Sequence, residues 1–181
     1  EKLMMLRTHG ITKDTKRLVK NEGPWYYEQQ LLGYNYRITD FQCALGISQL
    51  KKLQNSIKKR REIVDIYNKN LKNLKLIELP FEKEYVKSSW HLYYIQVKNH
   101  NKRREIFEKL RKNNIGCQVH YMPVYFHPYY QKLGYNRCKC YNAERFYKKV
   151  ISIPIFPSMK DEEINYVIDI LKNKLDTLEE I

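Results

Sequence analysis

Gly33-Tyr34-Asn35-Tyr36-Arg37-Ile38-Thr39-Asp40-Phe41-Gln42 leads from a glycine turn straight into the start of a helix. Thr39 and Gln42 have the spacing of a capping box, in which each side chain bonds the backbone N–H of the other residue. Backbone N–H groups at a helix start attract anions, and here Asn35 adds an amide donor and Arg37 a planar guanidinium. On chemistry alone, a structural turn, with Asn35 capping the backbone and Arg37 in an ion pair, is favoured over an anion site.

The residues after this turn predict a long amphipathic helix, from about residue 40 to about residue 72. A helix longer than average often bridges two lobes of a protein. The apolar side chains recur at helical spacing at Leu50, Leu53, Ile57, Val64, Tyr67 and Leu71.

Beyond residue 76 the pattern alternates between strands and helices, which indicates an α+β domain. Pro154 falls inside the last strand, which predicts a sheet edge or a strand end. Ser158 is expected to begin the last helix, because acidic residues follow it in the first turn. The expected elements are strands over 90–97, 115–121 and 150–155, a helix capped by Asn101, a short helix over 142–149, and a last helix whose apolar stripe reaches Leu175.

The chain has 181 residues, of which 43% are hydrophobic and 30% charged, the composition of a globular protein rather than a disordered one. Its formal net charge is +14, and basic surfaces bind the phosphates of nucleic acids. The basic residues are scattered, however, apart from clusters at 58–61 and 102–104 on predicted helices, where solvated faces are ordinary. Because Lys, Asn, Ile and Tyr are frequent throughout, biased coding is the favoured explanation, and we expect no nucleic-acid partner.

Several classes of protein are disfavoured by what the sequence lacks. No apolar run approaches the ~20 residues that span a bilayer, so we expect no membrane association. The start of the chain, without an initiator Met or a signal-peptide pattern, resembles a helix already under way, and we expect a piece of a longer protein. The four cysteines lack the spacing of a zinc site, which predicts no metal and reduced thiols in the cytoplasm.

Two aromatic segments contain further candidates for ligand binding. His120-Tyr121 and His127 place two imidazoles and a phenol on one predicted loop, equally suited to line a sugar or nucleotide pocket and to satisfy backbone carbonyls. Tyr26 lies in an aromatic turn over 23–28 that either contacts a substrate or packs. The sequence contains no P-loop, no H-E-x-x-H and no nucleophile elbow.

Taken in order along the chain, six motifs resemble the C-terminal half of DegT/StrS-type sugar aminotransferases, which depend on pyridoxal phosphate (PLP). Each motif is weak alone, but six in sequence order cover nearly the whole chain. The motifs are Leu6-Arg7-Thr8-His9-Gly10; Gly33-Tyr34-Asn35-Tyr36-Arg37; Gln42-Cys43-Ala44-Leu45-Gly46 with Gln49-Leu50; Ser88-Ser89-Trp90-His91-Leu92-Tyr93; His120-Tyr121-Met122-Pro123 with His127-Pro128; and Ile153-Pro154-Ile155-Phe156-Pro157-Ser158-Met159.

The resemblance implies the C-terminal small domain of a fold-type I PLP-dependent transferase, an α+β domain with its long connecting helix. Residues 1–39 are then the tail end of the large PLP-binding domain with active-site loops, 40–75 the connecting helix, and 76–181 the small domain. The family also implies a homodimer whose active sites are shared between the subunits.

Carried over by position, the resemblance assigns Asn35 to the PLP phosphate of the partner subunit, which reverses the preference for a purely structural turn. Arg37 supports that turn or binds an anionic group near it. The other substrate-binding candidates near the sugar-nucleotide pocket are His120, Tyr121, His127 and Tyr26.

The stretch 23–30 is most similar to the members of the pseudaminic acid pathway. These enzymes transfer an amino group from glutamate to C4 of a UDP-linked 4-keto-6-deoxy acetamido sugar. The lysine and the acidic residue that PLP chemistry requires are expected upstream of this chain, so no catalytic residue is assigned here. The alternatives are a basic nucleic-acid-binding module, a non-catalytic PLP-fold homologue, and a non-catalytic piece that serves in dimerisation or as a scaffold.

Overall fold

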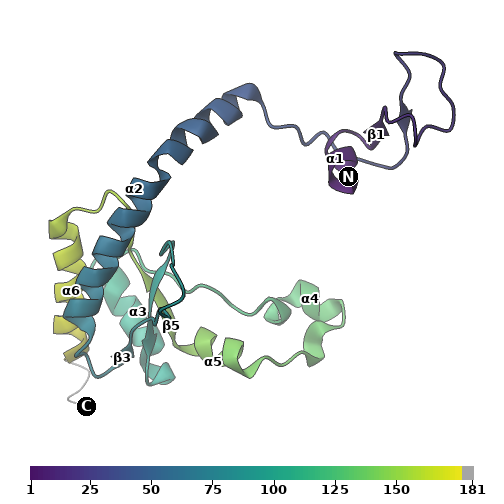
Figure 1. Ribbon diagram of the computed structural model, residues 1–181. Coiled ribbons are helices and arrows are strands. Elements are labelled where there is room, and N and C mark those ends of the chain that lie inside the picture. The colour runs from purple at the N-terminus through teal and green to yellow at the C-terminus, as the bar shows by residue number, and fades with distance from the viewer. Residues whose placement is uncertain (177–181) are drawn as a thin grey trace. The chain divides into compact units, whose positions relative to one another are not determined.

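The computed structural model describes residues 1–176, which form two compact units, Glu1–Lys52 and a second one that begins at Leu53. Helix α2, Asp40–Leu71, begins in the first unit and ends in the second (Figure 1). The long helix predicted over 40–72 is therefore confirmed. The division into 1–39, 40–75 and 76–181 stays a prediction.

The start of α2 is fixed by its own side chains. The backbone N–H of Thr39 donates to Gln42 Oε1 at 3.0 Å, and the backbone N–H of Gln42 donates to Thr39 Oγ1 at 3.3 Å. These reciprocal bonds satisfy donors that the first turn of a helix leaves without partners. The predicted capping box is confirmed.

The first unit also contains a short helix and a two-stranded antiparallel sheet. After the helix the chain turns through His9 and Gly10, whose φ angles are 61° and 72°. A left-handed residue without a Cβ atom commonly ends a helix, because glycine adopts this conformation at little cost. The elements are α1 (Lys2–Arg7), β1 (Ile11–Thr12) and β2 (Glu28–Gln29).

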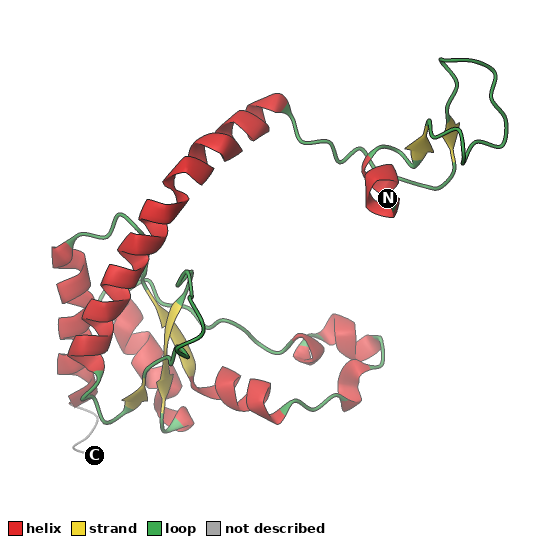
Figure 2. Ribbon diagram, in the orientation of Figure 1, coloured by secondary structure: helices red, strands yellow, loops and turns green. Residues whose placement is uncertain are grey.

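The second unit contains an antiparallel sheet in the order β3-β4-β5, with strands Ile77–Glu78, Tyr93–Val97 and Val150–Ile153 (Figure 2). In its register Ile95 lies opposite Ile151, and Tyr94 opposite Ser152. The remaining helical segments are η1 (His100–Lys102), α3 (Arg103–Lys112), η2 (Val124–Phe126), α4 (Pro128–Lys132), η3 (Tyr135–Arg137), α5 (Tyr141–Lys149) and α6 (Asp161–Asp176).

Alternation along the strands separates the two faces of this sheet. One face carries the apolar core that it shares with α2, α3 and α6, and α5 lies against the other face (Figure 1). There the ring of Phe146 packs edge-on against Tyr94 with 5.1 Å between the centroids. The fully buried core residues are Tyr67, Leu71, Tyr93, Ile95, Val97, Ile106, Leu110, Ile151 and Leu171.

The basic clusters contribute to this fold and are not simply solvated. Arg60 Nη1 donates to the carbonyls of Trp90 and Ile155 at 3.2 and 2.9 Å. Arg61 binds Glu82 in a two-pronged ion pair with distances of 3.1 and 3.0 Å. Arg103 donates to the carbonyl of Tyr147 and thereby joins α3 to α5. Three cations of the two clusters therefore hold loops and helix ends.

The three expected strands differ from the structure. The strand expected over 90–97 begins at Tyr93, because Trp90 has a φ angle of 49°, which no strand residue adopts. The strand expected over 115–121 is wrong, because this segment forms a single bridge, between Gln118 and Ser152. The strand expected over 150–155 ends at Ile153, before Pro154.

Two helix starts also differ from the prediction. Asn99, and not Asn101, accepts the capping bond, from the backbone N–H of Asn101 at 3.1 Å. The last helix begins at Asp161 rather than Ser158, and Glu163 reaches back to the N–H of Lys160 at 2.8 Å. The side chain of Leu175 and residues 177–181 lie outside the described part of the chain.

Replacement of Leu171 by alanine is expected to destabilise the second unit by about 2–5 kcal/mol, because this fully buried side chain would leave a cavity. Leu133→Ala is the matched control, since that leucine is 58% exposed, and it is expected to change stability by less than about 0.5 kcal/mol. Urea unfolding followed by circular dichroism measures both, and equal losses would contradict the assigned core.

Candidate functional site

In the first unit, the segment that carries Asn35 lies against the end of α1. The N–H of Tyr34 donates to the carbonyl of Leu6 at 2.7 Å, and the N–H of Tyr36 donates to that of Arg7 at 2.9 Å. Asn35 itself lies opposite Thr8 in an antiparallel bridge. The backbone on both sides of Asn35 is therefore fixed.

This close pairing requires two glycines. A Cβ atom at Gly33 would lie 2.1 Å from the backbone nitrogen of Gly10, and one at Gly10 would lie 1.7 Å from the carbonyl oxygen of Leu31. Both distances are far below van der Waals contact, and the obstructing atoms are backbone atoms. Any other residue at either position would separate the two segments.

Asn35 and Arg37 bind each other. The Nε–H of Arg37 donates to Asn35 Oδ1 at 2.9 Å, which fixes the orientation of the amide. The amide Nδ2 and the two terminal nitrogens of Arg37 have no partner among residues 1–176, and both side chains are exposed. The pair thus presents several exposed N–H donors, which are suited to a phosphate or a carboxylate.

Tyr26 belongs to a loop that is closed by one carboxylate. Glu28 accepts from the N–H groups of Val19 and Lys20 at 2.8 and 3.1 Å, and from the Tyr26 hydroxyl at 3.0 Å. These bonds lower the pKa of Glu28 to about 2, the bond from Val19 contributing most. Desolvation and the bond to Glu28 raise the pKa of Tyr26. Tyr26 also lines a cavity of about 300 Å³ within this loop.

In the second unit, His120 lies beside the sheet and binds a buried serine. Its Nδ1 is 2.9 Å from the hydroxyl oxygen of Ser152, which is 5% exposed. Both residues line a cavity of about 440 Å³ that also contacts His91, Gln118 and apolar residues of the segment after β5. The ring of Tyr121 packs edge-on against His120 with 4.5 Å between the centroids.

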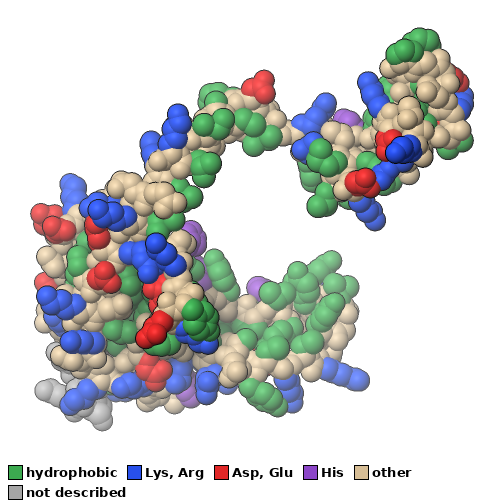
Figure 3. All heavy atoms as spheres, viewed as in Figure 1, with side chains coloured by type: hydrophobic (Ala, Val, Ile, Leu, Met, Phe, Trp, Pro, Cys, Tyr) green, Lys and Arg blue, Asp and Glu red, His purple; other side chains and the backbone are tan. Residues whose placement is uncertain are grey.

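The structure therefore brings some of the predicted residues together and leaves others apart. His120 and Tyr121 are in contact, although Tyr121 is 71% exposed. His127 is exposed at the start of α4 and shares no bond with either of them among those of the described residues. Around it, exposed apolar side chains gather on the lobe formed by η2, α4 and η3 (Figure 3): Val124, Tyr129, Leu133 and Tyr135.

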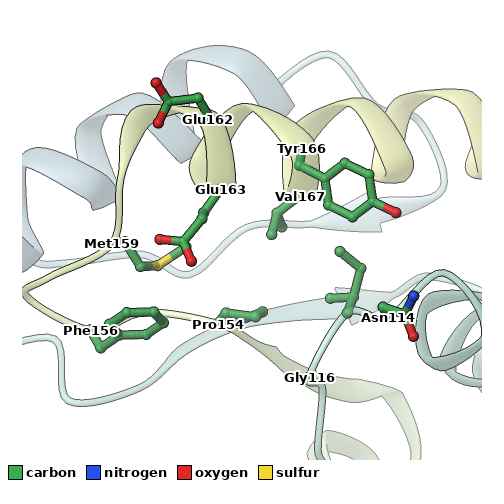
Figure 4. A pocket seen from close by; sticks show the side chains of 10 residues that line it. Asn114, Gly116, Pro154, Phe156, Met159, Glu162, Glu163, Tyr166 and Val167 are labelled. Atoms are coloured by element: carbon green, nitrogen blue, oxygen red, sulfur yellow. The ribbon is translucent and has the colours of Figure 1, made fainter.

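A second cavity, of about 370 Å³, adjoins the first and shares Gly116, Pro154 and Phe156 with it. Glu163 and Tyr166 extend toward it from α6, whereas Glu162 points away (Figure 4). The Tyr166 hydroxyl is already bonded to the carbonyl of Asn113 at 3.0 Å, and Glu163 to the N–H of Lys160.

Two residues of these sites had no place in the sequence-based predictions. Ser152 is a single hydroxyl within the apolar run 150–155. A lone polar residue in an apolar strand was the sequence feature that could have marked it as a candidate. Glu28 is an ordinary loop carboxylate, and its role depends on the folded loop. Within residues 1–176, no group of three or more metal-binding side chains is placed to hold an ion, and no described helix has the length and apolar character to cross a membrane.

The sequence profile of the DegT/DnrJ/EryC1/StrS aminotransferase family matches residues 1–172. The chain belongs to this family. The expected resemblance is confirmed by a relative from Campylobacter jejuni, a UDP-4-amino-4,6-dideoxy-N-acetyl-beta-L-altrosamine transaminase that is 41% identical over 173 residues. The match covers 94% of this chain and 44% of that protein.

Solved structures confirm the predicted α+β fold class. Helicobacter pylori PseC, an aminotransferase involved in the biosynthesis of pseudaminic acid, superposes with a TM-score of 0.84 at 29% identity, over 97% of this chain and 45% of PseC. The PLP form of the putative sugar aminotransferase Spr1654 from Streptococcus pneumoniae superposes with a TM-score of 0.82 at 28% identity, over 96% of this chain and 42% of Spr1654. The chain thus spans less than half the length of these relatives.

Gly33→Ala is expected to disrupt the pairing of the Asn35 segment with α1, because the new methyl group would overlap the backbone of Gly10. Limited proteolysis should then cleave the chain between residues 30 and 39 at least about tenfold faster. Gly46→Ala in α2 is the control, since no atom lies within 4 Å of its Cβ position, and it should leave the cleavage rate unchanged or lower it. Equal cleavage of the two variants would contradict the close approach.

The loop closed by Glu28 is expected to open in acid. Because the folded pKa of Glu28 lies near 2, below the ordinary 4.5, its contribution is fully present above pH 4.5 and is lost as the pH falls toward 2. Glu28→Gln should remove this dependence and expose 19–28 to proteolysis at neutral pH. Hydrogen exchange at the amides of Val19 and Lys20 measures the opening of the loop. Unchanged protection of these amides in Glu28→Gln would refute the role of Glu28 in closing it.

Proposed function

We propose that this chain is part of a PLP-dependent aminotransferase that acts on a nucleotide-linked sugar. The acceptor proposed is C4 of a UDP-linked 4-keto-6-deoxy acetamido sugar, and the proposed amino donor is glutamate. The observation that carries the proposal is the family match over residues 1–172, together with 41% identity to the Campylobacter jejuni transaminase.

In this proposal Asn35 contributes to the PLP phosphate site of a second subunit in a homodimer. The donors left free by the Asn35–Arg37 bond fit an anionic group in number and chemistry, because they include both amide and guanidinium N–H groups. When bound, PLP supplies the electron sink through which the amino group is transferred. This chain's own part is to bind and orient, with Arg37 fixing the amide of Asn35.

The remaining site residues are proposed to contact the sugar nucleotide. His120 and Tyr121 offer a ring nitrogen and a phenol beside a cavity of about 440 Å³. Tyr26 donates its hydrogen to Glu28, so its oxygen remains an acceptor for a ligand hydroxyl. His127 is included in this set only because the resemblance to the family assigns it to the sugar-nucleotide pocket. The four cysteines are free thiols, which agrees with a cytoplasmic enzyme.

The function is tested with the protein at its natural length, loaded with PLP and incubated with ¹⁵N-labelled glutamate and the UDP-linked keto sugar. The expected result is a sugar nucleotide that has gained one labelled amino group, detected by mass spectrometry. Bound PLP without label transfer would overturn the assigned substrates. Failure to bind PLP, combined with salt-dependent binding of duplex DNA, would instead favour the nucleic-acid-binding alternative.

Asn35→Ala is expected to weaken PLP binding by about tenfold, because it removes a donor to a charged group and releases Arg37. Asn73→Ala, at an exposed position after α2, is the control and should bind PLP like the wild type. Titration of the PLP absorbance in the natural-length protein measures both. Equal affinities of the two variants would remove Asn35 from the cofactor site.

A further inference from the structure

We propose that Ser152 is a positioning residue that fixes the imidazole of His120, so that Nε2 is the nitrogen offered to the ligand in the adjoining cavity. The proposal rests on the proposed function for the identity of that ligand, a sugar nucleotide. The contact between Ser152 and His120 does not depend on which ligand binds.

The backbone of Ser152 is held by the segment that carries His120. Its N–H donates to the carbonyl of Gln118 at 2.7 Å, and its carbonyl accepts from the N–H of Gln118 at 3.1 Å. The backbone N–H and carbonyl of Ser152 both bond to Gln118. Ser152 therefore faces Tyr94 on β4 as a cross-strand pair without backbone hydrogen bonds between the two residues. Ser152 therefore connects the edge of the sheet to the 118–120 segment.

The side chain of Ser152 points away from the apolar core. Its neighbours Ile151 and Ile153 belong to the core cluster shared with the helices, and alternation places Ser152 on the opposite face. Gln118, His120 and Ser152 all line the cavity of about 440 Å³. The 2.9 Å contact between Ser152 Oγ and His120 Nδ1 is formed on this face.

Burial makes this contact specific. Ser152 is the buried polar residue of the described chain, at 5% exposure, and a buried hydroxyl without a partner is destabilising because it has lost its hydrogen bonds to water. His120 Nδ1 supplies the hydrogen-bond partner that the hydroxyl has in the structure. The ring is thereby held with Nδ1 toward the sheet, while Nε2 has no partner among residues 1–176.

A hydroxyl suits this task because it both donates and accepts. When His120 is neutral with its hydrogen on Nε2, the Ser152 hydroxyl donates to Nδ1. When both ring nitrogens carry hydrogen, Nδ1–H donates to Ser152 Oγ instead. The hydrogen bond is retained in both states. In the neutral form that keeps its hydrogen on Nδ1, Nδ1–H also donates to Ser152 Oγ, so the ring can gain or lose a proton at Nε2 without rotating.

The test compares Ser152→Ala with two other variants of the natural-length protein, labelled with ¹⁵N-histidine. The chain has five histidines, and the His120 signals are identified by their loss in His120→Gln. In the wild type, Nδ1 should show the shift of a ring nitrogen that is hydrogen-bonded to a hydroxyl. In Ser152→Ala, this shift should move toward that of a solvent-exposed imidazole, and Ser152→Thr, which keeps the hydroxyl, should restore it at least in part. Ser158→Ala, at an exposed position, is the control and should leave it unchanged.

Kinetics give the second readout. Ser152→Ala should raise the KM for the sugar nucleotide about threefold to tenfold, with kcat changed less than about twofold, because orientation of a binding group is lost. Nitrogen shifts that are identical in Ser152→Ala and the wild type would overturn the positioning role, whether or not the protein transaminates. Altered shifts in a protein that does not transaminate would leave the positioning role supported and overturn the proposed function instead.

Discussion

The second unit depends on the alternation of side chains along β4 and β5. Because successive residues of a strand point to opposite faces, Tyr93, Ile95 and Val97 are buried against the helices, where the Tyr93 hydroxyl donates to Asn68 Oδ1 at 2.7 Å. The same pleat sends Tyr94 and Ser152 to the opposite face. One geometric constraint therefore builds the core and also delivers a hydroxyl to the cavity beside His120.

The first unit depends on a different constraint, the contact between two backbones at Gly10 and Gly33. No side chain fits between them, so the chain after α1 and the chain before α2 are held at backbone hydrogen-bonding distance. This contact fixes Asn35, and the Asn35–Arg37 bond then determines which amide atoms face solvent. The turn also leaves the side chains of Asn35 and Arg37 exposed.

Local signals predicted much of this fold, because they depend on few residues. The capping box at Thr39 and Gln42 needs two side chains three positions apart, and both are found as predicted. The strand expected over 115–121 failed because pairing depends on a distant strand, which meets this segment at Gln118 alone. The cap placed at Asn101 was wrong by two residues, since Asn99 has the same chemistry.

The candidate sites were less predictable, because the residues that orient the ligand-facing groups are far from them in sequence or lack a pattern. Ser152 lies 32 positions from His120, and Glu28 gathers donors from Val19 to Gln30. The orienting groups also differ in kind. A carboxylate such as Glu28 accepts only and so holds Tyr26 in one protonation state, whereas the Ser152 hydroxyl bonds His120 in both of its states. Among the candidate residues within the described part of the chain, His120 is the titratable ring that a buried hydroxyl orients.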